Sequence, residues 1–354
     1  MPTKILYAVL NWGLGHASRS IPIIKNILAQ NIELVLASDG EALLLLQKEF
    51  PNLVFETLPA YQIHYSKNAK DFDKTIFLQL PKLTVAIKNE HEQTQKLIEK
   101  HQISHIISDN RYGVYSKEIP SVIICHQLSL QHKNKLSQRI MNEVHFKLLN
   151  KFQEIWLPDF EGENALAGNI STTENKKIKA KTKYIGALSR FEKIETKILY
   201  DICILLSGPE PQRSILEEKL YVQASVSNLK IAFVRGISKP ENKLKVKSEI
   251  VVFNLLETNA LNLLLEQSKI VVCRAGYSSV MDLVKLQKPA ILIPTPGQTE
   301  QEYLAKFLNN KGFFVSKNQE EIDLQKDLAE VEKTNVSHFN FDLKALEKVL
   351  LDFF

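Results

Sequence analysis

The sequence predicts an α/β protein made of two doubly wound parallel sheets. Short apolar segments typical of buried strands alternate with longer segments of helical periodicity over most of the chain. The alternation pauses near residues 186–200 and then restarts with the same rhythm. Because strands that alternate with helices indicate parallel sheets covered on both faces, the pause divides the chain into two such domains.

The first domain is expected to span residues 1–188. Runs rich in Ile, Val and Leu predict its strands, because parallel strands are buried on both faces; they lie at 4–10, 32–37, 53–58, 104–108, 121–125, 154–157 and 183–185. Apolar residues at helical spacing predict helices at 16–30, 41–49, 76–100 and 131–152. The polar segments 61–73 and 164–183 are expected to be a loop and a connector.

A linker at residues 189–200 is expected to lead into a second domain at 201–335. Similar apolar runs predict its strands at 202–206, 230–234, 250–253, 270–273, 290–293 and 313–315, with a helix at 213–224 and further helices between most of the other strands. The last segment, 336–354, is apolar enough to dock as a helix on the first domain.

Length and composition are those of an ordinary globular protein, with 354 residues of which 44% are hydrophobic and 24% charged. No apolar run approaches the roughly 20 residues that span a bilayer, and the N-terminus lacks a secretion signal, so a cytoplasmic location is expected. Cys125, Cys203 and Cys273 lie in or at the end of apolar runs and are expected to be reduced, buried thiols.

Positive charge is concentrated in the predicted helix at 131–152, which also has apolar residues at helical spacing. Its basic residues are Lys133, Lys135, Arg139, Lys147 and Lys151, and Glu143 is its one acidic residue. A basic amphipathic helix can lie on an anionic membrane surface, and the alternative is an ordinary solvated helix face. The interleaving of aromatic and basic residues that is typical of nucleic-acid grooves is absent, so no nucleic-acid partner is expected.

The segment 270–307 carries the clearest indication of a ligand site. A predicted strand ends in Arg274-Ala275-Gly276, and a helical segment with Ser278, Ser279 and Asp282 follows. The next strand ends in a turn that carries Gln298, Glu300, Gln301 and Glu302. The carboxyl ends of neighbouring parallel strands form a crevice, and a helix N-terminus there favours an anion such as a diphosphate.

A second candidate site follows the first predicted strand, where Gly13 and Gly15 allow a tight turn before His16 and Arg19. The third glycine of a dinucleotide fingerprint is missing, which disfavours a nicotinamide cofactor. At this position His16 could remove a proton from an attacking hydroxyl, with Asp109 orienting its ring. Alternatively, His16 bonds within the turn and Asp109 only stabilises its own loop.

The turn from Ser207 and Gly208 to Arg213 joins a strand to a helix, and its backbone could meet phosphate oxygens, although its prolines make this a weak signal. The chain has no Walker motif and no Cys/His cluster with metal spacing, so neither a metal nor a bound cofactor is expected.

In these patches the chain resembles the GT-B glycosyltransferases, closest to the undecaprenyl-diphospho-muramoylpentapeptide N-acetylglucosaminyltransferase group (family 28). Cys273-Arg274-Ala275-Gly276 is similar to the CRSG motif of that family, and Asp282 stands where the family has a glutamate. The resemblance implies two Rossmann-like domains facing a central cleft. The second domain would bind a nucleotide-sugar, through Arg190, Ser207, Gly208, Arg274, Gly276, Ser278, Asp282, Gln298, Gln301 and Glu302.

The resemblance gives the first domain the acceptor. His16 would be the general base with Asp109, and the acceptor side would include Gly13, Gly15, Arg19, His126 and Gln127. The implied activity is metal-independent hexosyl transfer from a nucleotide-sugar, with UDP as the expected nucleotide, to an acceptor hydroxyl in bacterial cell-envelope chemistry. The acceptor is not identified.

Two alternatives to a transferase stay open. The pattern Gly-x-Gly-His-x-x-Arg at 13–19 also resembles the UDP-sugar hydrolase of pseudaminic acid synthesis, which shares this architecture, and water would then replace the acceptor. The other alternative is a non-catalytic nucleotide-sugar-binding protein.

Overall fold

The computed structural model describes residues 3–61, 72–132, 134–237, 249–336 and 344–354. They divide into two compact units. Unit 1 comprises Met1–Leu188 and Phe341–Phe354, and unit 2 comprises Ser189–Asn340. Most of the loop expected at 61–73 lies outside the described residues.

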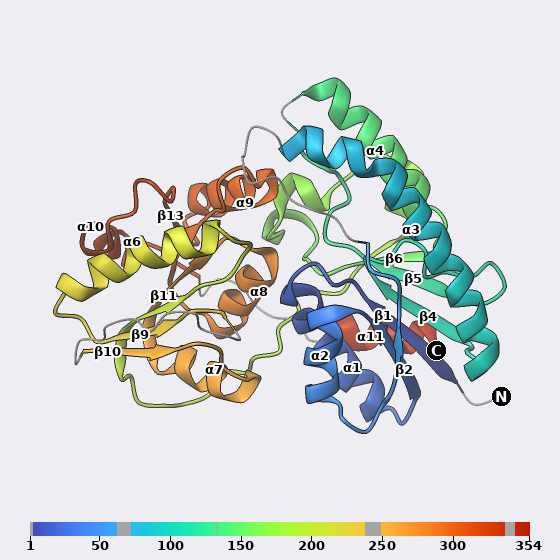
Figure 1. Ribbon diagram of the computed structural model, residues 1–354, viewed down its shortest axis with the longest axis horizontal. Helices are drawn as coiled ribbons and strands as arrows, with labels where there is room; N and C mark the ends of the chain where they lie inside the picture. The colour runs from blue at the N-terminus through green and yellow to red at the C-terminus, as the bar shows by residue number, and fades with distance from the viewer. Residues whose placement is uncertain (1–2, 62–71, 133, 238–248, 337–343) are drawn as a thin grey trace. The chain divides into compact units, whose positions relative to one another are not determined.

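The described part of unit 1 contains a seven-stranded parallel sheet with the strand order β3-β2-β1-β4-β5-β6-β7 (Figure 1). Its strands are β1 (Lys4–Val9), β2 (Glu33–Ser38), β3 (Val54–Thr57), β4 (His105–Asp109), β5 (Ser121–Ile124), β6 (Glu154–Leu157) and β7 (Thr182–Tyr184). The central strands are apolar and almost fully buried, as a parallel sheet covered on both faces requires. The predicted strands are present, with ends that differ by at most one residue.

The helices of unit 1 cover the two faces of this sheet (Figure 1). They are α1 (Leu14–Ala29), α2 (Gly40–Glu49), α3 (Phe72–His101), α4 (Lys135–Leu149), α5 (Lys176–Lys181) and α11 (Lys344–Phe353). The short helix α5 lies inside the segment expected to be an irregular connector. The Asn175 side chain caps α5 by accepting hydrogen bonds from the N–H groups of Lys177 and Ile178, a local signal that the composition of the segment obscured.

Helix α11 packs in unit 1, although the whole of unit 2 precedes it in the sequence. The Phe353 ring meets Trp156 edge to face at 5.3 Å between ring centroids, and it meets His105 at 5.2 Å. None of the helices in the described ranges combines the length and the apolar character needed to cross a bilayer.

Unit 2 contains, within its described residues, a six-stranded parallel sheet with the order β10-β9-β8-β11-β12-β13. The strands are β8 (Tyr200–Leu205), β9 (Ile231–Val234), β10 (Ile250–Phe253), β11 (Ser268–Arg274), β12 (Ala290–Ile293) and β13 (Val315–Ser316). The accompanying helices are α6 (Gln212–Val226), α7 (Thr258–Glu266), α8 (Tyr277–Leu286), α9 (Thr299–Asn310) and α10 (Leu324–Val331). The core lies between the sheet and these helices. The predicted doubly wound α/β class is confirmed for both sheets.

The segment expected to be a free linker is coil, but its first residues are fastened to unit 2. Phe191 is almost fully buried, and the Asn262 side chain on α7 donates to the Glu192 carbonyl at 3.0 Å. Lys193 donates to Gln287 at 2.6 Å. Residues 189–193 therefore belong to unit 2 through side-chain contacts that their polar composition did not indicate.

Candidate active site

In unit 1, His16 and Asp109 meet at the carboxyl edge of the sheet. His16 lies in the first turn of α1, which follows β1, and Asp109 ends the neighbouring strand β4. The His16 Nδ1 atom is 2.8 Å from Asp109 Oδ1. When Nδ1–H donates to this carboxylate, the Nε2 atom of the ring keeps its lone pair and can accept a proton.

Arg19, one turn further along α1, holds the carboxylate in place. Its Nε donates to Asp109 Oδ2 at 2.8 Å, its Nη2 donates to Oδ1, and Ser20 also donates to Oδ2, at 3.2 Å. Burial alone would raise the pKa of Asp109, but Arg19 and His16 outweigh it and hold that pKa well below its usual range. Burial, followed by the charge of Arg19, lowers the pKa of His16. His16 is therefore neutral at physiological pH, as a general base must be.

Two of the expected acceptor-side residues, Arg19 and His126, are joined to this pair. The Arg19 Nη1 atom lies 2.9 Å from His126 Nδ1, which follows β5, and so joins His126 to the His16–Asp109 group. The Gln127 carbonyl accepts a hydrogen bond from the buried His145 ring at 2.8 Å. Gly13 has a φ of 69°, and a Cβ there would meet nothing within 4 Å, so the turn before His16 has open space beside it. Gly15 lies in the first turn of α1.

A buried ion network in unit 1 was not predicted from the sequence. Arg111 donates to Glu90 Oε1 at 2.5 Å and to Asp39 Oδ1 at 2.7 Å. It also donates to the Pro59 and Val9 carbonyls, at 2.6 and 3.1 Å. Val9 ends β1, Asp39 and Pro59 follow β2 and β3, and Arg111 follows β4, so one guanidinium ties the ends of four neighbouring strands to Glu90 of α3 at the edge that carries His16. Arg111 lies two residues after Asp109, just after the end of the same strand, and this position in the sequence could have indicated that it lies near the site.

In unit 2, Arg274 ends β11 and is almost completely buried. Its guanidinium donates to the Gln212 carbonyl at 2.7 Å, to Gln319 Oε1 at 2.6 Å and to the carbonyls of Ile293 and Pro294. This geometry does not favour the direct contact with a diphosphate that was expected for Arg274, because both terminal nitrogens of its guanidinium donate hydrogen bonds to protein oxygens. Instead, Arg274 ties the ends of β11 and β12 to the start of α6 and to the segment after β13.

No carboxylate among the described residues forms an ion pair with Arg274. Burial lowers its pKa to about 10, so the site holds a positive charge that no carboxylate of the described ranges neutralises. The Nε atom of Arg274 and the hydroxyl of Thr295, both buried, have no hydrogen-bond partner among the described atoms. Both lie within about 4 Å of where a Cβ on Gly208 would stand. Gly208 has a φ of 102°, so a glycine is favoured at this exposed turn. Ser207, beside it, is also exposed.

The N-terminus of α8 opens beside this cation. Gly276 is the N-cap residue, it makes no side-chain cap, and the first turn contains no acidic residue. A Cβ at Gly276 would approach only Ser279, at 3.9 Å, so the helix end is uncrowded. Ser278 lies in the first turn and is partly exposed. The helix dipole favours an anion here.

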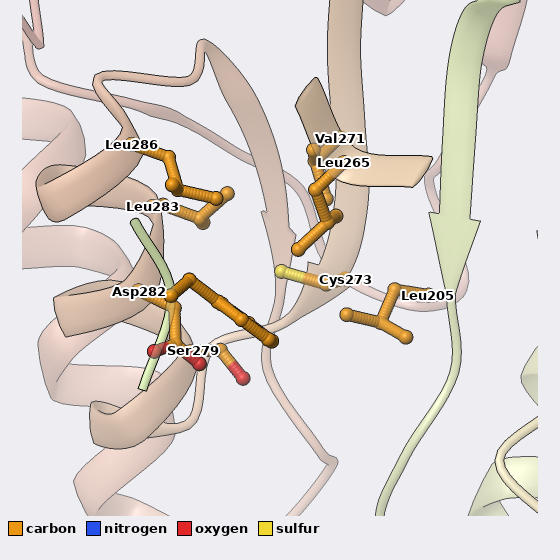
Figure 2. Close-up of a pocket in the computed structure, with 9 residues that line it drawn as sticks. Leu205, Leu265, Val271, Cys273, Ser279, Asp282, Leu283 and Leu286 are labelled. Carbon is orange, nitrogen blue, oxygen red and sulfur yellow. The ribbon is translucent and has the colours of Figure 1, made fainter. Parts of the chain in front are cut away.

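Asp282, one turn further along α8, borders a small cavity of about 20 Å³ (Figure 2). Its Oδ1 accepts a hydrogen bond from Ser189 at 2.5 Å. Burial raises the pKa of Asp282 to about 7, against the opposing effects of Ser189 and Arg190. Arg190 itself donates to Thr258 at 3.1 Å and lies over the Phe191 ring.

Gln301 and Glu302 fold back onto the turn that precedes α9. Gln301 accepts from the Thr295 N–H at 2.9 Å, and Glu302 accepts from the Gly297 N–H at 2.8 Å. The Gln301 side chain also donates to Gln298. These side chains therefore shape the turn after β12; Gln298 and Gln301 are partly exposed, and Glu302 is exposed.

The predicted residues thus form one group in each unit. The structure joins His16, Arg19, Asp109 and His126 directly in unit 1. In unit 2, the residues at the carboxyl edges of β8, β11 and β12 collect around Arg274. Ser189, Thr295 and Gln319 were missed, since each depends on a contact distant in sequence. In the part of the chain that the structure describes, no group of three or more His, Cys, Asp or Glu side chains could hold a metal ion.

Two family models match the chain. The glycosyltransferase family 28 C-terminal domain matches residues 215–348, and glycosyl transferase family 1 matches residues 3–139. An uncharacterized glycosyltransferase of Methanosarcina acetivorans is 22% identical over 325 residues, which cover 88% of this chain and 82% of that protein. The UDP-N-acetylglucosamine–N-acetylmuramyl-(pentapeptide) pyrophosphoryl-undecaprenol N-acetylglucosamine transferase of Prochlorococcus marinus is 31% identical over 97 residues, or 27% of this chain and 26% of that one.

Solved glycosyltransferase structures share the fold. Acinetobacter baumannii MurG superimposes with a TM-score of 0.61 and 12% identity and covers 99% of both chains. The kitacinnamycin glycotransferase gives a TM-score of 0.64 with 13% identity, and the alignment covers 99% of this chain and 93% of that one.

Proposed function

We propose that this chain, a glycosyltransferase of the GT-B type related to family 28, transfers a sugar from a nucleotide-sugar, with UDP as the nucleotide, to an acceptor hydroxyl. Unit 2 would bind the donor, and unit 1 would bind the acceptor and supply the base. The observation that carries the donor assignment is Arg274, a buried cation without a carboxylate partner in the described structure. A diphosphate at the neighbouring turn would supply the missing negative charge.

The leaving diphosphate would lie at the N-terminus of α8, next to the Ser207–Gly208 turn. There the helix dipole and the charge of Arg274 stabilise the negative charge that develops as the sugar departs. We expect the reaction to proceed without a metal, because these fixed positive groups serve the same purpose. The Asp282 carboxylate would accept hydrogen bonds from the ribose hydroxyls, and the turn shaped by Gln298, Gln301 and Glu302 would contact the sugar.

The geometry of His16 supports the proposed chemical step. Its neutral ring, with Nδ1–H directed at Asp109, would take the proton of the acceptor hydroxyl on Nε2 as the hydroxyl oxygen attacks the anomeric carbon. The bond from that carbon to the diphosphate oxygen breaks, and the nucleoside diphosphate leaves.

Nucleotide binding is the first test of this function. We expect a UDP-sugar to raise the melting temperature of the protein, since a ligand at 100 times its Kd stabilises the folded state by about 2.7 kcal/mol. The panel should contain UDP-, dTDP-, GDP- and ADP-sugars, each with and without EDTA. If no member of the panel shifts the melting temperature or binds in calorimetry, the proposed function is wrong. Rapid release of free sugar without any acceptor would instead identify a hydrolase.

We further propose that α4 holds the enzyme on the inner face of the plasma membrane. Leu136, Ile140 and Val144 recur every four residues along α4, and all three are exposed. The exposed basic residues Lys135, Arg139, Lys147 and Lys151 lie on the same helix or directly after it. An apolar stripe flanked by positive charge is complementary to an anionic lipid surface.

Sedimentation with liposomes tests this surface. The wild type is expected to bind vesicles of phosphatidylcholine and phosphatidylglycerol more strongly than phosphatidylcholine alone, and the binding should weaken as salt rises. The double variant Leu136→Ser, Ile140→Ser should bind at least about tenfold more weakly, because each buried apolar side chain contributes about 1.5–3 kcal/mol. The matched control is Val222→Ser, which alters an exposed valine on α6. Equal binding of both variants would refute the proposal.

A further inference from the structure

Ser189, the first residue of unit 2, has its hydroxyl fixed by two contacts. The Phe191 N–H donates to the Ser189 Oγ at 3.1 Å. The single hydroxyl hydrogen is therefore free to be donated, and it goes to Asp282 Oδ1 at 2.5 Å. Ser189 is almost fully buried, so water does not compete for this bond.

The backbone around Ser189 is held independently of Asp282. Phe191 is almost completely buried, Asn262 donates to the Glu192 carbonyl, and Arg190 donates to Thr258. The position of the Ser189 hydroxyl is thus set by two hydrogen bonds with α7 and by the burial of Phe191. The Ser189 hydroxyl can therefore fix the orientation of the Asp282 side chain, because its own position does not depend on Asp282.

Asp282 has few other groups that favour its charged form. The cavity beside it has an apolar lining, formed by Phe191, Leu205, Leu265, Val271, Leu283 and Leu286, and the polar atoms near it come from Ser279 and Cys273 (Figure 2). Within the part of the chain that the structure describes, the charged or titratable groups that face the carboxyl are Arg190, from the coil before β8, and Cys273, from β11. A buried carboxylate in such surroundings depends strongly on each hydrogen bond that it accepts.

We propose that Ser189 is a positioning residue for donor recognition: its hydroxyl orients Asp282, so that the carboxylate can accept hydrogen bonds from the ribose diol. This inference rests on the proposed function, because it gives a further residue of the same donor site. One carboxylate oxygen is occupied by Ser189, which leaves the other for the ribose. Charge-assisted bonds to the ribose are about twice as strong as neutral ones, so the protonation state of Asp282 affects donor affinity.

The sign of the pH effect follows. Burial raises the pKa of Asp282 to about 7, and the Ser189 bond opposes this rise. Donor affinity should therefore increase with pH through neutrality in the wild type. Removal of the Ser189 hydroxyl should raise the pKa of Asp282 further, by about one unit. The rise of donor affinity with pH should then move to higher pH by the same amount.

Two measurements on the full chain test the proposal. The first is the pKa of Asp282, from carboxyl-carbon NMR of the protein without ligand. The second is the Kd of UDP-N-acetylglucosamine between pH 5.5 and 9, a probe preferred to UDP because a terminal phosphate itself titrates near pH 6. Both are made on the wild type, Ser189→Ala, Ser189→Thr and Asp282→Asn. The control is Ser225→Ala, which removes a hydroxyl that bonds only within α6.

Ser189→Ala is expected to titrate Asp282 about one pH unit higher and to bind the probe about fivefold more weakly at pH 7, with little loss at pH 9. Ser189→Thr should restore wild-type behaviour, and Asp282→Asn should bind weakly at every pH. If Ser189→Ala has the wild-type Asp282 pKa, or loses affinity equally at all pH values, the positioning role is wrong although the donor site stands. If neither UDP-N-acetylglucosamine nor any nucleotide-sugar of the panel binds the wild type, the proposed function itself fails.

Discussion

Replacing His16 with alanine is expected to lower kcat by about 10²- to 10⁴-fold, the range usual for loss of a general base. The Kd of the nucleotide-sugar should change little, because the residues proposed to bind it all lie in unit 2. Turnover should be measured at saturating donor, so that changes in donor binding do not contribute. The control is His101→Ala, which removes a histidine at the end of α3 that pairs with Glu56.

The pH profile separates a base from a residue that only shapes the turn. Burial and Arg19 lower the pKa of His16 from its usual 6.5, so kcat should rise with pH through a midpoint below 6.5 and then reach a plateau. Asp109→Asn removes an interaction that raises this pKa and orients the ring, so it should move the midpoint lower and reduce the plateau. A His16→Ala variant that retains wild-type kcat would exclude the proposed mechanism.

The second large effect is expected on the stability of unit 1, when Arg111 is replaced. Arg111→Met is expected to destabilise unit 1 by about 3–5 kcal/mol, because it leaves the fully buried Glu90 without its cation. Glu90 also accepts hydrogen bonds from the Tyr61 hydroxyl at 2.5 Å and the Gly113 N–H at 2.8 Å, and these are too few to stabilise an isolated buried charge.

Urea unfolding followed by tryptophan fluorescence measures this effect. Both tryptophans of the chain, Trp12 and Trp156, belong to unit 1, so the signal reports on that unit. The double variant Arg111→Met, Glu90→Gln should recover part of the loss, since it removes both buried charges. Arg139→Met, on the exposed face of α4, should change stability by no more than about 0.5 kcal/mol. If Arg111→Met lowers the free energy of unfolding by no more than Arg139→Met does, the Arg111 network contributes little to stability.

Much of the fold was predictable because the signals are local. The apolar runs at 4–10 and 270–273 correspond to β1 and β11, since a central parallel strand needs apolar residues on both faces. The contact between His16 and Asp109 was also foreseeable, because each side chain follows a strand and parallel strands end at the same edge of a sheet. The short helix α5 was missed because its signal is a single capping asparagine in a polar segment.

The sequence by itself determined that this chain forms two doubly wound parallel sheets and that histidine, arginine and aspartate side chains lie at their carboxyl edges. Tertiary structure decided what those side chains do there. Arg274 points into the protein because its terminal nitrogens find carbonyl and amide oxygens from β12, α6 and the segment after β13. Asp282 titrates near neutral pH because α8 and β11 bury it beside an apolar cavity, where Ser189 reaches it across 93 residues of chain. The apolar pattern of a strand depends on residues that are neighbours in the sequence, whereas the charge state, burial and hydrogen bonding of a side chain depend on partners that only folding brings together.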